Sequence, residues 1–205
     1  FFIVFFMFFF YFDIVMKTSM LQEKIVYYLK NLRKEIIQTF ESFESTSRFE
    51  KTPWDHHSGG GGEIAILRGN VFEKAAVNWS GVKGSQLPFK KERTPFFATG
   101  VSLITHMHNP KAPTVHMNVR YIETSNQSWF GGGYDLTPMG FPQLEDTNHF
   151  HNTAKNALGK NLYEKFSKNA KDYFTIKHWN KERGVGGIFF DQYNTGNFEE
   201  DFKMW

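Results

Sequence analysis

The chain has 205 residues, and its 24 Lys and Arg against 21 Asp and Glu give a formal charge of +3, too small to indicate binding to nucleic acid or to an anionic membrane. It contains no cysteine, which excludes a disulfide framework, a thiolate metal site, an iron–sulfur cluster and a cysteine nucleophile. With 40% hydrophobic and 22% charged residues, it has the composition of a globular protein with an apolar core.

The N-terminal residues 1–15 are almost wholly apolar and read FFIVFFMFFFYFDIV. This run is shorter than the roughly 20 residues that a helix needs to cross a bilayer. It also lacks the basic start and the small-residue cleavage site of a signal peptide. We therefore interpret it as an extension outside the fold, upstream of a true start at Met16, so that the domain spans residues 16–205. A membrane anchor is the alternative.

The first predicted element is an amphipathic helix from Met20 to Phe43. Its apolar residues recur at spacings of three and four, as one stripe of a helix does. They are Leu21, Ile25, Tyr28, Leu29, Leu32, Ile36, Phe40 and Phe43. Such a stripe is typical of packing and carries no chemistry by itself. The polar stretch 44–53 then ends the helical period.

Short segments rich in β-forming residues follow, at 63–67, 71–80, 96–106 and 114–123, with Gly, Pro, Asn and Lys between them. They predict neighbouring antiparallel strands. Helical patterns then cover 146–158, 162–170 and 172–183, and a glycine turn at 184–187 leads into another strand. Strands that precede helices favour an α+β fold with a single domain.

The most informative polar residues lie on two of these strands. Side chains alternate along a strand, so His116, Asn118 and Arg120 share one face. Ser102 and His106 share a face of the preceding strand by the same rule. If the two faces align, these five side chains form a surface that could bind anions and move protons. The alternative is the solvated face of an antiparallel sheet, which is common.

A second suggestive segment is WFGGGYDLTP, from Trp129 to Pro138. Three glycines allow backbone N–H groups to crowd around an anion or a flat ring, and Asp135 adds a carboxylate. The alternative is a β-turn in which Asp135 caps the local backbone. No GK[ST], GxGxxG or GxSxG pattern accompanies the glycines, so a phosphate loop, a dinucleotide fold and a serine hydrolase are not indicated.

The remaining histidines are less specific. His149 and His151 lie two apart on a predicted helix, so at most one of them faces a cleft. His178 is alone on its predicted helix. One histidine from each of four elements could assemble a metal site, but no HExxH motif supports one.

Together these segments resemble the oxygen-dependent coproporphyrinogen III oxidase family. The resemblance covers nearly everything after Met16. Its motifs are long and carry unusual residues in order, so chance is a poor explanation. The matching stretches are GGGG (59–62), VFEKAAVNWSGVKG (71–84), ATGVSLITHMHNPKAPTVHMNVRYIE (98–123), WFGGGYDLTP (129–138), EDTNHFH (145–151), DYFTIKH (172–178) and ERGVGGIFFD (182–191).

The resemblance implies a large flat antiparallel sheet flanked by helices on both faces, in a cytoplasmic homodimer. It implies oxidative decarboxylation of two propionates of coproporphyrinogen III to vinyl groups, which gives protoporphyrinogen IX in haem biosynthesis. O₂ is the co-substrate, no organic cofactor is obligatory, and a divalent metal has a disputed role. Neither a nucleic-acid partner nor stable membrane insertion is expected.

The resemblance also assigns roles to residues of this chain. His116 matches the proton donor, and Asp135 matches the aspartate that holds the pyrrole nitrogens. The positions that match substrate-contacting residues are Ser102, Asn118, Val119 and Arg120. The histidines that match metal ligands are His106, His116, His151 and His178.

Some positions depart from the family pattern. Ser128 stands where a tryptophan is usual, Trp179 replaces an arginine, and Gln192-Tyr193 replaces a more usual Asp-Leu pair. The sequence given stops at Trp205, before an RRGRYVEFN-like strand of the family that contributes substrate contacts and dimer surface. We therefore expect a C-terminally truncated member, and the alternative function is an inactive porphyrin- or metal-binding remnant of the fold.

Overall fold

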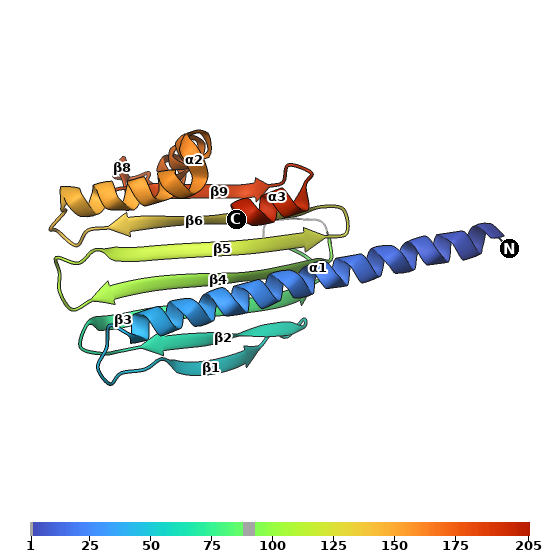
Figure 1. The fold of residues 1–205 in the computed structure, drawn as a ribbon, viewed down its shortest axis with the longest axis horizontal. Coiled ribbons are helices and arrows are strands. Elements are labelled where there is room, and N and C mark those ends of the chain that lie inside the picture. The colour runs from blue at the N-terminus through green and yellow to red at the C-terminus, as the bar shows by residue number, and fades with distance from the viewer. Residues whose placement is uncertain (1, 88–92) are drawn as a thin grey trace.

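The computed structural model describes the backbone of residues 2–87 and 93–205, and side chains within these ranges from Met20 onward. Its main feature is a seven-stranded antiparallel sheet with the strand order β1-β2-β3-β4-β5-β6-β9 (Figure 1). The strands are β1 (Glu50–Asp55), β2 (Gly60–Leu67), β3 (Phe72–Gly84), β4 (Phe96–Met107), β5 (Thr114–Thr124), β6 (Ser128–Thr137) and β9 (Gly187–Tyr193). A separate hairpin pairs β7 (Thr175–Ile176) with β8 (Lys181–Glu182).

The helices are α1 (Phe2–Glu41), α2 (Leu144–Phe174) and α3 (Phe198–Met204). This arrangement confirms the α+β class and the single domain. The long first helix contains the predicted stripe, whose Ile25 and Leu29 are fully buried against the sheet. Within the described part of the chain, no helix is long and apolar enough to cross a membrane. We expect residues 1–15 to stand outside the fold. Their side chains are not among the described residues, so this stays a prediction.

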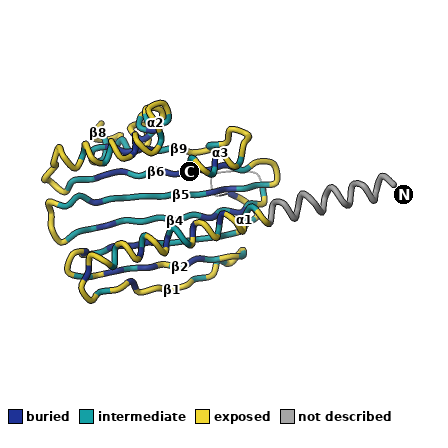
Figure 2. The backbone as a smooth tube through the Cα atoms, viewed as in Figure 1, coloured by how far each residue is buried: buried dark blue, intermediate teal, exposed yellow. Residues whose placement is uncertain are grey.

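α1, α3 and the first part of α2 pack on one face of the sheet (Figure 1), and only the C-terminal end of α2 contacts the other face, through Tyr173 and Phe189. α1 crosses β3 and β4, and the first part of α2 places Phe150 against Tyr134 of β6. α3 stacks its aromatic side chains on Phe130 of β6. The apolar residues of the strands face these helices because that is where burial removes them from water. Figure 2 shows the helix surfaces that point away from the sheet as exposed.

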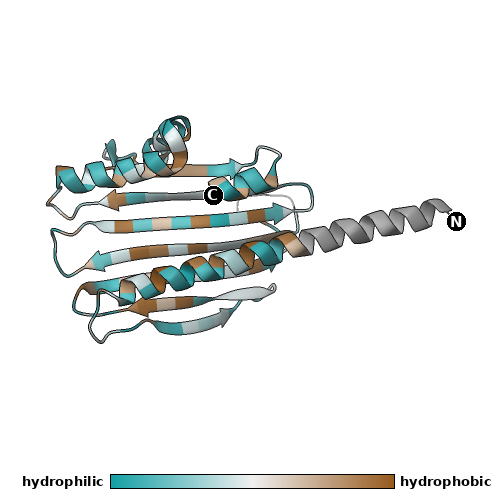
Figure 3. Ribbon diagram, viewed as in Figure 1, coloured by the Kyte–Doolittle hydropathy of each residue, from teal (hydrophilic) through white to brown (hydrophobic). Residues whose placement is uncertain are grey.

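The opposite sheet face carries the polar residues of the alternating pattern, and we call it the open face. Ser102, His116, Asn118 and Arg120 lie on it, while Val119 and Met117 pack against the core on the helical face. Apolar and polar bands accordingly alternate along β4 and β5 (Figure 3). Leu87, in the segment after β3, covers one end of the open face, where it packs with Ile122 and Trp129.

The C-terminal part of α2 reaches around the sheet edge to the open face, where the ring of Tyr173 stacks on Phe189 of β9 at 3.8 Å. A helix was predicted over 172–183. Instead, α2 ends at Phe174 and the β7–β8 hairpin follows, with Asn180 in a left-handed conformation (φ 47°) at its turn. Such a conformation is incompatible with a continuing helix.

Two strands of the seven-stranded sheet were not predicted. β1 contains Pro53, but it is an edge strand, where a missing N–H does not interrupt the sheet. β6 contains the glycine triplet, and it is an inner strand that pairs with β5 and β9 rather than a turn. The turn interpretation of Asp135 was therefore wrong.

Candidate functional site

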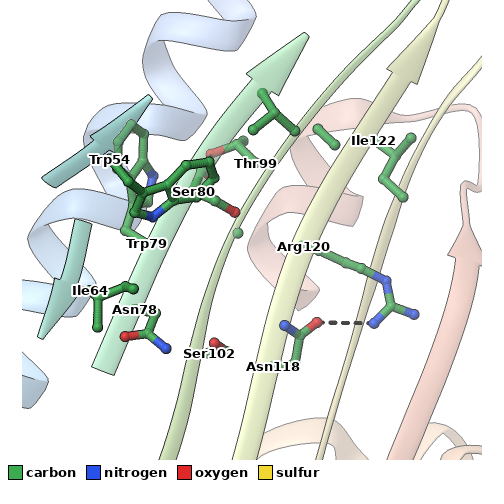
Figure 4. Close-up of a pocket in the computed structure, with 13 residues that line it drawn as sticks. Trp54, Ile64, Asn78, Trp79, Ser80, Thr99, Ser102, Asn118, Arg120 and Ile122 are labelled. Atoms are coloured by element: carbon green, nitrogen blue, oxygen red, sulfur yellow. Dashed lines mark hydrogen bonds between the residues drawn. The ribbon is translucent and has the colours of Figure 1, made fainter. Parts of the chain in front are cut away.

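Polar side chains form a row across the middle of the open face. The strand register places Asn78 of β3 opposite Ser102 of β4, and Ser102 opposite Asn118 of β5. They contribute to the lining of a hollow of about 460 Å³, a size within the roughly 300–1,000 Å³ of small-molecule sites. The predicted convergence of Ser102, Asn118 and Arg120 on one surface is therefore confirmed (Figure 4).

The walls of this hollow are aromatic and aliphatic. Trp54 lies over Gly62, where an added Cβ would be only 2.7 Å from the indole ring. Ile64 and Ile122 also line the hollow, whereas Trp79 borders it through its backbone, because its ring lies on the helical face with Lys30 Nζ of α1 4.3 Å from the ring centre. Apolar walls with a few polar groups on the floor suit a ligand with a flat apolar body and polar substituents.

Arg120 is the cation of this hollow. Its Nη1 donates a hydrogen bond to Oδ1 of Asn118 at 3.0 Å, so the side chain leans along the strand toward the polar row (Figure 4). Its Nη2 lies 3.2 Å from Oδ1 of Asp191 on β9, and the guanidinium carbon lies 5.8 Å from the ring centre of Phe189. Only 28% of the Arg120 side chain is exposed, and a partly desolvated guanidinium binds carboxylates strongly.

The glycine triplet makes this position of Arg120 possible. A Cβ at Gly131, which pairs with Arg120, would lie 2.9 Å from Arg120 Nε and 2.7 Å from Asp191 Oδ1. Glycine thus leaves space for the two charged side chains to cross the strand. The predicted close approach at these glycines is made by side chains of the chain itself.

His116 and Asp135 lie opposite each other on β5 and β6, beyond the residues that line the hollow. The Nδ1 atom of His116 is 3.4 Å from Oδ2 of Asp135. Asp135 is 1% exposed, and Arg183 binds both of its oxygens: Nε donates to Oδ2 at 2.9 Å and Nη2 to Oδ1 at 2.7 Å. Thr137 donates a longer hydrogen bond of 3.4 Å to Oδ2.

The ionisation of Asp135 follows from these contacts. Burial acts to raise its pKa, but hydrogen bonds and positive charge from His116 and Arg183 outweigh that effect. The net result is that the pKa of Asp135 lies below its ordinary value, so the group is a carboxylate at neutral pH. Both oxygens already accept hydrogen bonds and the side chain is 1% exposed, so little of the carboxylate is open to a ligand in this arrangement.

The four histidines expected as metal ligands do not come together in this structure. His106 and His116 lie on β4 and β5, but His178 is exposed beside Trp179 in the turn after β7. His151 uses both ring nitrogens, one with the carbonyl of Val185 at 2.9 Å and one with the hydroxyl of Tyr163 at 3.0 Å. Within the described ranges, no group of three or more His, Cys, Asp or Glu residues is placed to hold a metal. This donor set does not fit a metal, and we derive no step through one.

Val119 was also expected to contact substrate. Its side chain faces the helices, so it can reach the open face only through its backbone. The sequence interpretation missed Arg183, Asp191 and Asn78. Strand alternation over 187–193 would have placed Phe189 and Asp191 on one face. No local pattern indicated Arg183, because its partner Asp135 is 48 positions away.

A large antiparallel sheet with most of its helical layer on one face, and a hollow with one arginine and apolar walls on the other, defines an α+β protein whose hollow suits an anionic ring compound. Comparison with known proteins identifies it further. The family described as coproporphyrinogen III oxidase matches residues 24–205. The chain belongs to this family.

Curated relatives agree with this assignment. The oxygen-dependent coproporphyrinogen-III oxidase of Rickettsia akari (strain Hartford) is 42% identical over 196 residues, an alignment that covers 86% of this chain and 70% of the relative. The protein of the same name from Rickettsia bellii (strain OSU 85-389) is 41% identical over the same shares. The suspected resemblance is thereby confirmed.

Proposed function

We propose that this chain is an oxidoreductase that converts two propionates of coproporphyrinogen III to vinyl groups with O₂, the reaction that its relatives' name and the family indicate. The observation that carries the proposal is the row of Ser102, Asn118 and Arg120 on the floor of an aromatic hollow. A porphyrinogen offers a broad apolar body and carboxylates at its rim, which match this hollow.

The chemistry of each propionate requires a binding group and a proton-handling group. The side chain loses CO₂, one proton from the carbon next to the ring, and two electrons. O₂ takes up the two electrons and two protons to become H₂O₂. Electrons and protons therefore balance when one further proton comes from the surroundings. The protein must bind the carboxylate and move protons beside the carbon next to the ring.

We assign carboxylate binding to Arg120, with Ser102 and Asn118 as further polar contacts. The guanidinium is held by Asn118 and Asp191, so it is oriented before the substrate arrives. Preorganisation of this kind lowers the entropy cost of binding. A propionate that takes the place of Asp191 would make a two-pronged pair with Arg120, which Lys cannot make.

We assign proton transfer to His116 and a charge-balancing role to Asp135. His116 is four residues from Arg120 on one strand, which corresponds to a separation of about 13 Å between their Cα atoms. The lean of Arg120 toward Asn118 shortens the distance between the two functional groups. A buried carboxylate next to His116 stabilises positive charge that develops on the ring or on the imidazole.

The proposal is tested with anaerobically reduced coproporphyrinogen that is mixed with the chain in air, with the product oxidised and followed by porphyrin fluorescence. Wild-type turnover supports the proposal, and binding without turnover indicates the porphyrin-binding remnant. Arg120→Ala should raise KM and lower kcat, because the carboxylate contact exists before the transition state. Arg120→Lys should resemble Arg120→Ala, and an Arg120→Lys variant with wild-type kinetics would contradict the assignment.

From the resemblance we also propose that the chain acts as a homodimer in the cytoplasm and needs no organic cofactor. Light scattering on the purified chain and cell fractionation test the first two points. Because the histidines are dispersed, turnover should persist after exhaustive chelation. Stoichiometric metal whose removal abolishes turnover would contradict this.

A further inference from the structure

Arg183 has no role in the proposed reaction so far, although it makes two hydrogen bonds to a buried carboxylate. It comes from the segment after the β7–β8 hairpin and binds both oxygens of Asp135, at 2.9 and 2.7 Å. Its guanidinium carbon lies 4.5 Å from the ring centre of Phe174 at the end of α2, and its backbone N–H donates to the carbonyl of Phe174. The guanidinium of Arg183 therefore packs against an aromatic ring, and a hydrogen bond fixes its backbone.

The carboxylate that Arg183 binds lies beside a buried imidazole nitrogen of His116. Nδ1 of His116 is buried and has no hydrogen-bond partner among the described residues, and Oδ2 of Asp135 lies 3.4 Å from it. In a neutral imidazole one nitrogen carries the proton and the other accepts one. A carboxylate at Nδ1 favours the tautomer with the proton there, as in other carboxylate–histidine pairs.

The position of the Asp135 oxygens is consequently what selects the tautomer. The side chain of Asp135 could rotate about its last torsion, because its longer contacts to Thr137 and His116 are both 3.4 Å. The two short bonds to Arg183 prevent that rotation, because a planar fork matches a planar carboxylate in only one orientation.

We infer that Arg183 is a positioning residue: it fixes the carboxylate of Asp135 so that His116 keeps its proton on Nδ1 and presents Nε2 to the substrate. His116 is 28% exposed while its Nδ1 is buried, which leaves Nε2 as the nitrogen for proton exchange on the open face. The inference deepens the proposed function and rests on it for the role of His116. Among the described residues, the charged groups that act on Asp135 are His116 and Arg183.

The test uses the full chain labelled with ¹⁵N-histidine, without substrate. Long-range ¹H–¹⁵N spectra distinguish Nδ1–H from Nε2–H imidazole, and a His116→Gln sample identifies the signal. We expect wild-type His116 to be in the Nδ1–H form when neutral. Arg183→Gln should shift it toward the Nε2–H form that unrestrained imidazole prefers. Arg68→Gln, at an exposed arginine that bonds the carbonyl of Glu73, is the matched control and should leave the spectrum unchanged.

Steady-state kinetics supply the second readout. Arg183→Gln should lower kcat by about 10- to 100-fold, the usual effect of removing a group that orients a functional histidine, with KM nearly unchanged. Arg183→Lys keeps the charge without the fork and should be intermediate in both tautomer and kcat. If Arg183→Gln does not fold, as judged by circular dichroism, Arg183→Lys decides the question.

The inference would be overturned by an unchanged tautomer in a folded Arg183→Gln chain. It would also be overturned by an Arg183→Lys chain that matches wild type in both tautomer and kcat. The spectra need no turnover, so they separate a failure of this inference from a failure of the proposed function. A wild-type chain with the Nδ1–H tautomer and no oxidase activity would leave the positioning role intact and refute only the function.

Discussion

Asp135 is the residue on which the charges of the site converge. It is 1% exposed, and its negative charge is balanced by Arg183 and by His116 when that imidazole is protonated. A buried carboxylate without such partners would be costly, so the three residues depend on one another. The residue therefore links the hairpin side of the molecule to the strand that carries the polar row.

We expect Asp135→Ala to lower kcat by about 100-fold or more, as is typical for loss of a preorganised charge-stabilising group. KM should change less, because Arg120 still binds the carboxylate. The porphyrin fluorescence assay measures both parameters. Asp172→Ala, at an exposed residue of α2, is the control. If Asp135→Ala alters KM alone, the assignment of Asp135 fails.

Strand alternation alone placed His116, Asn118 and Arg120 on one face, and the strand register confirms this shared face. The period of two is a property of the backbone, so it needs no knowledge of neighbours. The partners of Arg120 and Asp135 could not be predicted in this way. Asp191 and Arg183 reach them only after β9 and the β7–β8 hairpin have docked, and local patterns do not encode that docking.

Among the elements, β6 shows how glycine can serve a sheet interior. Gly131 gives space to side chains, whereas Gly133 gives space to backbone: a Cβ there would lie 2.6 Å from the carbonyl oxygen of Ile188 on β9. Side chains can move aside at modest cost, but a paired strand cannot.

Two alanine substitutions should therefore behave differently. Gly131→Ala should fold normally and raise KM, because Arg120 and Asp191 are displaced. Gly133→Ala should destabilise the chain by about 1–3 kcal/mol, since β9 must shift. Thermal unfolding and the kinetic assay on both variants check this pair, and equal stability of the two variants would refute the distinction.

The loop after α1 is tied to the sheet by Glu44. Its carboxylate accepts backbone N–H groups of Asn70, Val71 and Phe72 at 2.8–2.9 Å. The hydrogen bond from Phe72 is the largest effect on its pKa, and with the other bonds it holds that pKa below the ordinary value of 4.5 although burial opposes them. The carboxylate form is therefore favoured by folding.

The pH dependence follows from the direction of this shift. A lowered pKa contributes stability above the ordinary value of 4.5, and that contribution is lost as the pH falls through the lower pKa of the folded state. We expect Glu44→Gln to lower the urea midpoint at neutral pH and to approach wild type in acid. Urea titrations over this range measure the gap. A gap that stays constant with pH would show that the charge of Glu44 is not responsible.

The elements themselves were predictable where the period was long. The stripe of α1 and the alternation of β2 to β5 extend over enough residues to be distinct. β6 and β1 were missed because glycine and proline normally indicate turns, and only their places in the sheet, inner for β6 and edge for β1, make them acceptable. The helix predicted at 172–183 failed because its apolar residues serve the hairpin and the open face.

For the whole molecule, the helical face holds the main core. Ile25 and Leu29 of α1 share one buried cluster with Val77 and Val101 of the sheet. The helical face thus contains the main core, and the open face carries the candidate site.

The family match begins at residue 24, so a chain that begins at Met16 should keep its fold. We expect the free energy of unfolding to change by no more than about 0.5 kcal/mol, as for surface changes remote from a core. Circular dichroism and thermal unfolding of both chains compare them. A loss of cooperative unfolding on removal of residues 1–15 would show that this segment contributes to the core.

The class of the whole molecule was predictable because strands precede helices, but the placement of the helices was not. The sequence shows which side of α1 is apolar, yet it does not show which sheet face receives it. That choice depends on the summed burial of β3, β4 and β5, whose Val77, Val101 and Val119 lie on the face opposite to Arg120.

The order of the strands also determines how the chain can fold. β1 to β6 follow one another in the sheet as they do in the sequence, so each pair closes by a short connection, whereas β9 pairs with β6 only after about fifty intervening residues. Long loops are slow to close, so β9 is expected to dock after the six-stranded meander has formed. A substitution that weakens this last pairing, such as Gly133→Ala, should accelerate unfolding and leave the refolding rate nearly unchanged in stopped-flow measurements. Arg183, Phe189 and Asp191 arrive with β9 and the segment before it, so the site becomes complete only in the final step of folding.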